Sequence, residues 1–170
     1  MTVRVYVPSS LRRLEAWATG TASPAAEGGG DLTAYAVTPA VRTAHPGIPE
    51  EELEYLAMST ASLSSAALLE EHEPQRRLVL AVDVTGAEPV GTEDPFEVGI
   101  AGFRWPEDVA AYHLDSADAE PAVRAARLAW REQGDGWEDQ VAATAAYDLG
   151  WYAATEVPEL RALLDADPER

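Results

Sequence analysis

The chain has 170 residues, the usual size of one folded domain, and 46% of them are hydrophobic, which is enough for an ordinary core. Its 30 acidic and 12 basic residues give a formal net charge of −18, which disfavours nucleic acid and anionic membranes as partners and permits a basic protein, a cationic ligand or a metal ion. It has no cysteine and no stretch near the roughly 18 apolar residues of a membrane span, so disulfides and thiolate sites are excluded and a cytoplasmic protein is expected.

The N-terminal segment predicts a strand, a helix and a loop. Alternating valines over residues 3–7 are typical of a half-buried strand, which Pro8 is expected to end. Ser9 or Ser10 then caps a short helix. Residues 21–31 contain three consecutive glycines and predict a flexible loop.

A second strand is predicted over residues 32–37. Thr38 and Pro39 are typical of a helix start, with threonine as the N-cap and proline in the first turn. A longer helix follows over residues 50–70, with three glutamates at its N-terminus. Its buried stripe is predicted at Leu53, Leu56, Thr60, Leu63 and Ala67.

Three strands are predicted in the middle of the chain. Residues 78–84 (LVLAVDV) are almost all apolar, which favours a strand near the sheet centre that is buried on both faces. Residues 85–95 predict a loop rich in glycine and proline. Further strands are expected over residues 96–100 and 109–114.

The C-terminal third is mostly helical in this interpretation. Ser116 or Asp118 is expected to cap a helix that buries Val123, Ala126 and Trp130. A second helix is expected over residues 137–146 and a last one over 158–164. Residues 147–153 fit a short strand or a helix, and the tail 165–170 is expected to fray.

Strands interleaved with helices, without a long linker, predict one domain over residues 1–170. The expected fold class is α/β (α+β), a layered fold with a mixed five- or six-stranded sheet and helices packed on it.

Five segments together resemble a family of small, uncharacterised actinobacterial proteins: VRVYVPSSLRRL, AYAVTPAVR, LVLAVDV, DVAAYHLDSADAEPAVRAA and LGWYAATEVPEL. The resemblance runs from residue 3 to about residue 164. It implies a single cytoplasmic domain and no particular chemistry, because the family has no assigned activity.

The densest polar cluster contains His113, Asp115, Asp118 and Glu120. His113 and Asp115 are two residues apart on a predicted strand and therefore share a face. Such a set could hold Mg²⁺ or Mn²⁺. The structural alternative is that Asp118 caps the next helix, that Glu120 interacts with its dipole and that His113 is an ordinary strand residue.

Two further places could form sites. The helix N-terminus at Ser9 and Ser10 could bind an anion through free backbone amides, although helix capping explains both serines. The aromatic pair Trp151 and Tyr152 could anchor an interface or belong to the core.

Two functions are therefore expected to compete. The first is a non-catalytic binding or adaptor protein without a cofactor, whose partner is a basic protein or a second copy of the chain. The alternative is a metal-assisted enzyme, such as a hydrolase, centred on His113 and Asp115. Convergence of Asp83, His113 and Asp115 in a pocket would favour the enzyme.

Overall fold

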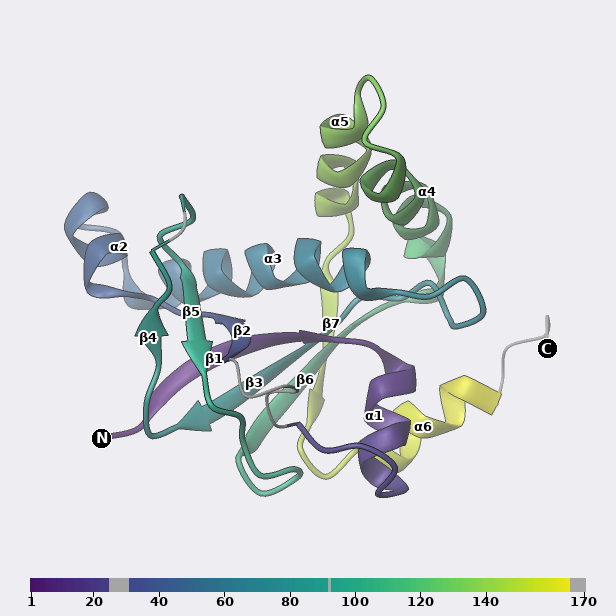
Figure 1. Ribbon diagram of the computed structural model, residues 1–170, viewed down its shortest axis with the longest axis horizontal. Helices are drawn as coiled ribbons and strands as arrows, with labels where there is room; N and C mark the ends of the chain where they lie inside the picture. Colours follow the sequence, from purple (N-terminus) through teal and green to yellow (C-terminus); the bar gives the residue numbers. More distant parts are fainter. Residues whose placement is uncertain (25–30, 92, 166–170) are drawn as a thin grey trace.

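The computed structural model describes residues 1–24, 31–91 and 93–165, which form one α+β domain around a seven-stranded antiparallel sheet (Figure 1). The strand order is β4-β5-β2-β1-β3-β6-β7. The strands are β1 (Val3–Ser9), β2 (Leu32–Tyr35), β3 (Leu78–Val84), β4 (Glu88–Pro89), β5 (Glu97–Ile100), β6 (Val109–Asp115) and β7 (Leu149–Ala153). The α-helices are α1 (Leu11–Ala18), α2 (Pro39–Ala44), α3 (Glu50–Leu68), α4 (Glu120–Glu132), α5 (Trp137–Ala142) and α6 (Val157–Asp165).

The middle of the sheet is formed by β1 and β3. All seven residues of β1 pair with β3, and Val7 lies opposite Leu80 in this ladder. The predicted position of LVLAVDV near the sheet centre is confirmed, because β3 lies between β1 and β6. Both faces of β3 are covered, which explains why its sequence does not alternate between apolar and polar residues.

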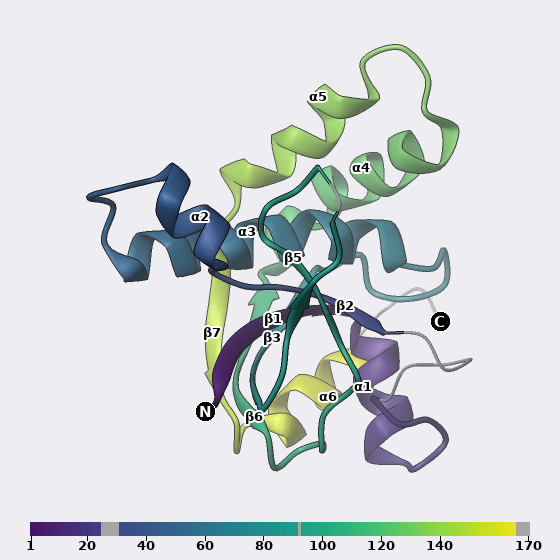
Figure 2. The same cartoon turned by 60° about the vertical axis from the view of Figure 1, so that its left-hand side comes forward.

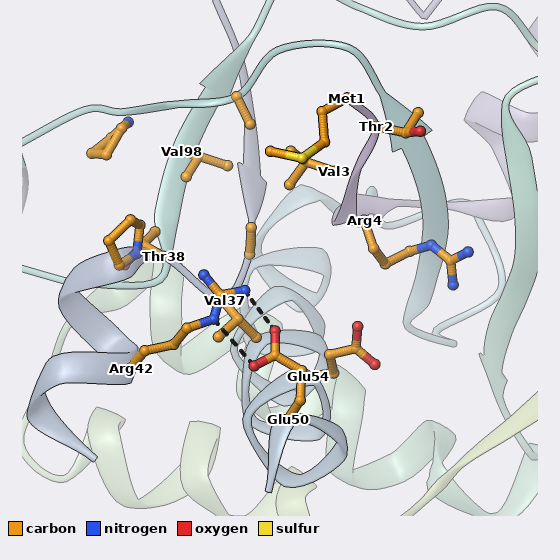
Figure 3. A pocket seen from close by; sticks show the side chains of 14 residues that line it. Met1, Thr2, Val3, Arg4, Val37, Thr38, Arg42, Glu50, Glu54 and Val98 are labelled. Carbon is orange, nitrogen blue, oxygen red and sulfur yellow. Dashed lines mark hydrogen bonds and ion pairs between the residues drawn. The ribbon is translucent and has the colours of Figure 1, made fainter. Parts of the chain in front are cut away.

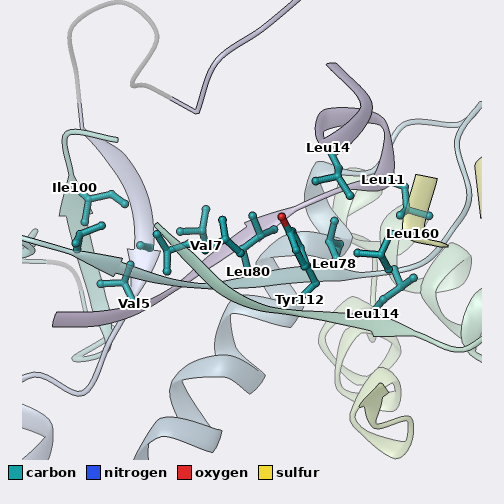
Figure 4. Packing of buried hydrophobic residues seen from close by; sticks show 14 of the residues in the cluster. Val5, Val7, Leu11, Leu14, Leu78, Leu80, Ile100, Tyr112, Leu114 and Leu160 are labelled. Atoms are coloured by element: carbon teal, nitrogen blue, oxygen red, sulfur yellow. The ribbon is translucent and has the colours of Figure 1, made fainter. Parts of the chain in front are cut away.

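The larger core lies on the sheet face that α1 and α6 cover. Figure 4 shows side chains from the strands, such as Leu80 and Tyr112, packing beside Leu14 of α1 and Leu160 of α6. All four are fully buried. Helices from the two ends of the chain thus close one core.

Helix α3 covers the opposite face of the sheet (Figure 1). Its buried positions include Leu53, Ala57, Ala61 and Ser65, whereas the predicted Leu56 is 43% exposed. The predicted stripe is therefore confirmed at Leu53, wrong at Leu56 and half-buried at Thr60, Leu63 and Ala67. Small side chains let α3 lie close to the sheet. Alanine and serine therefore occupy most of its buried positions, instead of the largest apolar residues.

Helices α4 and α5 pack on each other and rise from the body of the domain on the α3 side (Figure 2). The prediction that Trp130 is buried was wrong: it is 37% exposed and makes an edge-to-face contact with Trp137, with ring centroids 5.3 Å apart. Arg127 is buried instead, and its Nε donates a hydrogen bond to the Gln75 side chain at 2.7 Å. The buried contact between α4 and the segment before β3 thus contains a polar pair whose hydrogen-bonding groups are matched to each other.

The α+β class is confirmed, while the sheet differs from the prediction in two details. It has seven strands instead of five or six, and the described pairs are all antiparallel instead of mixed. The additional strand is β4, whose two residues lie in the segment expected to be a loop. Two residues carry no periodicity, and strand direction depends on the connections rather than on local pattern.

The predicted helix starts hold for two elements. Ser10 caps α1 and Thr38 caps α2, each accepting a hydrogen bond from a backbone amide three residues later. Pro8 lies inside β1 instead of ending it. Residues 149–153 form the strand alternative. The predicted loop 21–31 and tail 165–170 lie largely outside the described residues.

Candidate functional site

Asp115 and Arg77 form a buried ion pair between the end of β6 and the residue before β3. Both residues are 1% exposed. The guanidinium donates from Nε to Oδ2 and from Nη2 to Oδ1, each at 2.8 Å, and the Arg77 backbone amide donates to Oδ2 at 2.7 Å. Two parallel bonds of this kind are the strongest geometry for such a pair.

Further contacts complete the arginine's surroundings. Arg77 Nη2 donates to the backbone carbonyl of Tyr147 at 3.0 Å, and Nη1 donates to the Ser62 hydroxyl at 3.3 Å. The pair thus links α3, the segment before β3, the end of β6 and the segment before β7 in one hydrogen-bonded unit. A buried charge needs this degree of satisfaction, because an unpaired one is costly.

Two further members of the predicted polar cluster, Asp118 and Glu120, also have protein partners. Glu120 accepts a hydrogen bond from Arg76 Nε at 2.9 Å, and the Asp118 carboxylate is bonded to the Ser116 hydroxyl. Neither Ser116 nor Asp118 caps α4 through its side chain, because a 3₁₀ turn over Ala117–Ala119 leads directly into the helix.

The residues proposed for metal-assisted chemistry do not share one pocket. Asp83 forms an ion pair with Arg4 at 2.6 Å, while Asp115 forms one with Arg77. Across the three described ranges, no group of three His, Cys, Asp or Glu side chains is placed to hold a metal ion. The geometry therefore gives the hydrolase alternative no specific support.

His113 lies on the α3 side of β6, opposite Val79 and Trp151 in the sheet. Burial lowers the pKa of His113 below its ordinary value of 6.5, and the positive charge of Arg4 lowers it further. Both effects disfavour the protonated imidazole. The neutral ring is thus the form that the folded chain accommodates.

This shift predicts that acid weakens the fold. The unfolded chain binds the His113 proton more readily, so the free energy of unfolding is expected to fall as the pH drops through about 6.5, until the pH lies below the folded-state pKa. Urea unfolding at stepped pH measures this slope. His113→Gln should flatten it between roughly pH 7.5 and 5.5, whereas His45→Gln, at an exposed position, should not. Equal slopes in all three proteins would contradict the assignment.

The predicted anion site at the start of α1 is used for capping. Ser10 Oγ accepts a hydrogen bond from the Arg13 amide at 3.2 Å. Ser9 is fully buried, and its hydroxyl has no hydrogen-bond partner within the described ranges. The hydroxyl lies below the surface, so anion binding there stays a prediction without further support.

The outer strand β7 presents an open edge. It pairs with β6 on one side, and the described residues place no strand on its other side. The Ala153 amide donates to Glu156 Oε2 at 2.6 Å, and the Ala153 carbonyl accepts from the Glu156 amide at 3.0 Å, so both groups point away from β6. Backbone groups alternate in an antiparallel ladder, so those of Leu149 and Trp151 also point outward.

Two aromatic side chains flank this edge. Trp151 is 64% exposed and lies on the α3 side of the sheet, the same side as Leu149. Tyr55 of α3 is 53% exposed, and its hydroxyl donates to Asp148 Oδ1 at 3.3 Å, just before the strand. Tyr152 packs instead against the core on the opposite face. We call Tyr55, Asp148, Leu149 and Trp151 the β7 surface.

Only Trp151 of this surface was singled out from the sequence. Tyr55 and Asp148 are 93 positions apart, and no periodic pattern relates them. Arg77 was not among the candidate site residues. An arginine directly before an almost fully apolar strand is the available signal for a buried partner, but it does not identify Asp115.

The family comparison matches residues 3–161 to the model described as "Family of unknown function (DUF6912)". The chain belongs to this family. No curated protein and no solved structure matches the chain significantly. Membership in DUF6912 agrees with the resemblance to an uncharacterised family, and the actinobacterial source stays a prediction. Within the described ranges, no helix of this DUF6912 chain is long and apolar enough to cross a membrane.

Proposed function

We propose that this chain is a non-catalytic binding protein that takes an extended segment of a basic protein along β7. The single observation behind the proposal is the open β7 edge beside the 64% exposed Trp151. An extended segment can add a strand to such an edge, where main-chain hydrogen bonds give affinity and side-chain contacts give selectivity. Tryptophan and tyrosine are the residue types that most often anchor protein interfaces.

The contrast between the two sheet edges supports the proposal. The other edge strand, β4, has only two residues, one of which is Pro89, and proline lacks the amide needed for pairing. Short length and proline are common means by which proteins protect an edge from association. The five residues of β7 have no proline, and no strand of the described residues pairs with the outward groups of Leu149 and Trp151.

Charge favours a basic segment over a second copy of the chain. The net charge of −18 repels another copy and attracts a cationic partner. Asp148 lies directly at the β7 edge. Nucleic acid is disfavoured for the same reason, and Arg76, Arg77 and Arg131 are already paired with carboxylates. A cytoplasmic location fits this proposal and stays an expectation.

A synthetic nine-residue peptide of alternating arginine and valine tests the proposal by calorimetric titration. We expect saturable binding that weakens as salt rises, together with slower amide exchange at Leu149 and Trp151. Trp151→Ala should weaken binding at least about tenfold, because a central aromatic anchor commonly contributes this much. Its melting temperature should stay unchanged, since the side chain is mostly exposed.

Matched controls isolate the edge. Leu128→Ala removes an exposed apolar side chain from α4 and should leave binding unchanged. A peptide with proline in place of valine keeps the charge but loses alternate amide donors, so it should bind much more weakly. Equal binding of both peptides, or full binding by Trp151→Ala, would refute the proposal. A dimer in sedimentation that Trp151→Ala converts to a monomer would assign the edge to self-association instead.

A further inference from the structure

A separate cavity of about 530 Å³ lies near the start of β1, far along the sheet from β7. Its walls come from β1, from α2 and the segment before it, from the first turns of α3 and from the β4–β5 side of the sheet (Figure 3). Sites for small organic ligands usually have volumes of this order. The cavity shares no residue with the β7 surface.

One part of the wall is aliphatic. Val3, Val37 and Val98 line it together with Ala87 and Pro89. Figure 3 shows Val37 and Val98 beside the cavity, with Val3 across from them. Such a wall fits a hydrocarbon or aromatic group, because its contact with the aliphatic side chains removes apolar surface from water.

The other part of the wall is charged, and its arginines already have acidic partners. Arg42 donates to Glu50 from Nη2 at 2.6 Å and from Nε at 3.1 Å. Arg4 donates to Asp83 from Nε at 2.6 Å and from Nη2 at 3.0 Å. Each guanidinium is thus neutralised by one carboxylate through two bonds.

Glu54 is the carboxylate in excess. It lies one helical turn after Glu50 on α3, and Figure 3 shows it beside Glu50, on the side of Arg4. It is half-buried, and within the described ranges its interactions with Arg4, Tyr6 and Arg42 are effects of its charge rather than hydrogen bonds. The pKa of Arg42 is raised first by its hydrogen bonds to Glu50 and that of Arg4 by its hydrogen bonds to Asp83, and the charge of Glu54 makes the smallest contribution to each. Two arginines and three carboxylates leave one negative charge among the side chains of this wall. The terminal ammonium, on Met1, also lines the cavity, but Met1 lies beside Val3 and away from Glu54 (Figure 3).

Tyr6 is close enough for the charge of Glu54 to act on it, and it provides no compensating charge. Burial raises the pKa of Tyr6 to about 12, and the charge of Glu54 contributes to the rise. The phenol of Tyr6 is therefore neutral at physiological pH. The carboxylate oxygens of Glu54 can accept hydrogen bonds from a ligand.

We infer that this cavity binds a small organic cation, with an ammonium group on Glu54 and an apolar body against the valines. An ammonium offers three donors and one positive charge, which match the free carboxylate. A bare metal ion fits less well, since a group of three potential metal ligands is lacking among the described residues and much of the wall is aliphatic. This inference is independent of the proposed function at β7.

Three probes with one aromatic body test the charge preference: phenethylamine, phenethyl alcohol and phenylacetate. They are titrated separately into the ¹⁵N-labelled chain and followed by amide chemical shifts. We expect phenethylamine to bind at least about tenfold more tightly than the other two, with shifts at Val37, Glu54 and Val98. Absence of saturable shifts for phenethylamine up to millimolar concentration would overturn the inference, as would tighter binding of phenylacetate.

Glu54→Gln is the decisive variant, because it keeps the size of the side chain and removes its charge. The preference for phenethylamine over phenethyl alcohol should disappear in Glu54→Gln and persist in Glu52→Gln, which changes an exposed residue on the same helix. An unchanged preference in Glu54→Gln would overturn the inference. Equal melting temperatures of the two variants would exclude unfolding as the cause of a lost preference. Trp151→Ala should bind phenethylamine normally, which separates this cavity from the β7 surface.

Discussion

Asp115→Ala is expected to lower the free energy of unfolding by about 3–5 kcal/mol, because it leaves the Arg77 guanidinium buried without its counter-charge. The Arg77 backbone amide loses its acceptor at the same time. Native stability is commonly about 5–15 kcal/mol, so this single change removes a large part of it. Urea unfolding followed by circular dichroism measures the difference.

Two comparisons show whether the buried charge causes this loss. The double variant with Asp115→Leu and Arg77→Met removes both charges and should recover more than half of the stability lost in Asp115→Ala. Arg42→Met breaks an ion pair whose side chains are 50% and 48% exposed, so it should cost at most about 1 kcal/mol. A double variant less stable than Asp115→Ala would show that the individual hydrogen bonds matter more than the unpaired charge.

Leu80→Asp is expected to unfold the chain. Leu80 is fully buried in β3, opposite Val7 on one side and Tyr112 on the other. A carboxylate there has no nearby cation in the core cluster, and an unpaired buried charge costs several kcal/mol. Loss of the far-ultraviolet circular dichroism signal at 25 °C, or a cooperative transition shifted far below that of the parent chain, is the expected result.

Leu128→Asp is the matched control, since Leu128 is 45% exposed on α4. A substitution at such a surface position usually changes stability by less than about 0.5 kcal/mol. The contrast between the two leucines therefore tests burial rather than the chemistry of the substitution. A soluble Leu80→Asp variant that melts like the parent would show that β3 is not held in the centre of the sheet.

Local pattern was sufficient for much of the secondary structure. Alternation over β1 and the nearly unbroken apolar run of β3 predicted both strands, because side-chain period follows backbone geometry. Ser10 and Thr38 marked two helix starts, because a short hydroxyl side chain satisfies a free amide wherever a helix begins. These features depend on residues only a few positions apart.

The tertiary structure alone decided the strand directions, the face of α3 that is buried and the partners of the charged residues. Arg77 and Asp115 are 38 positions apart, and Tyr55 and Asp148 are 93 apart. From the sequence, Asp115 was a candidate metal ligand together with His113, because the sequence does not show which cation pairs with a given carboxylate. Burial opposite Arg77 gave it a structural role instead. Composition alone determined that the chain is acidic. Only the fold determined that Glu54 lies at a cavity and Trp151 at an open sheet edge, because chain packing brings distant segments together.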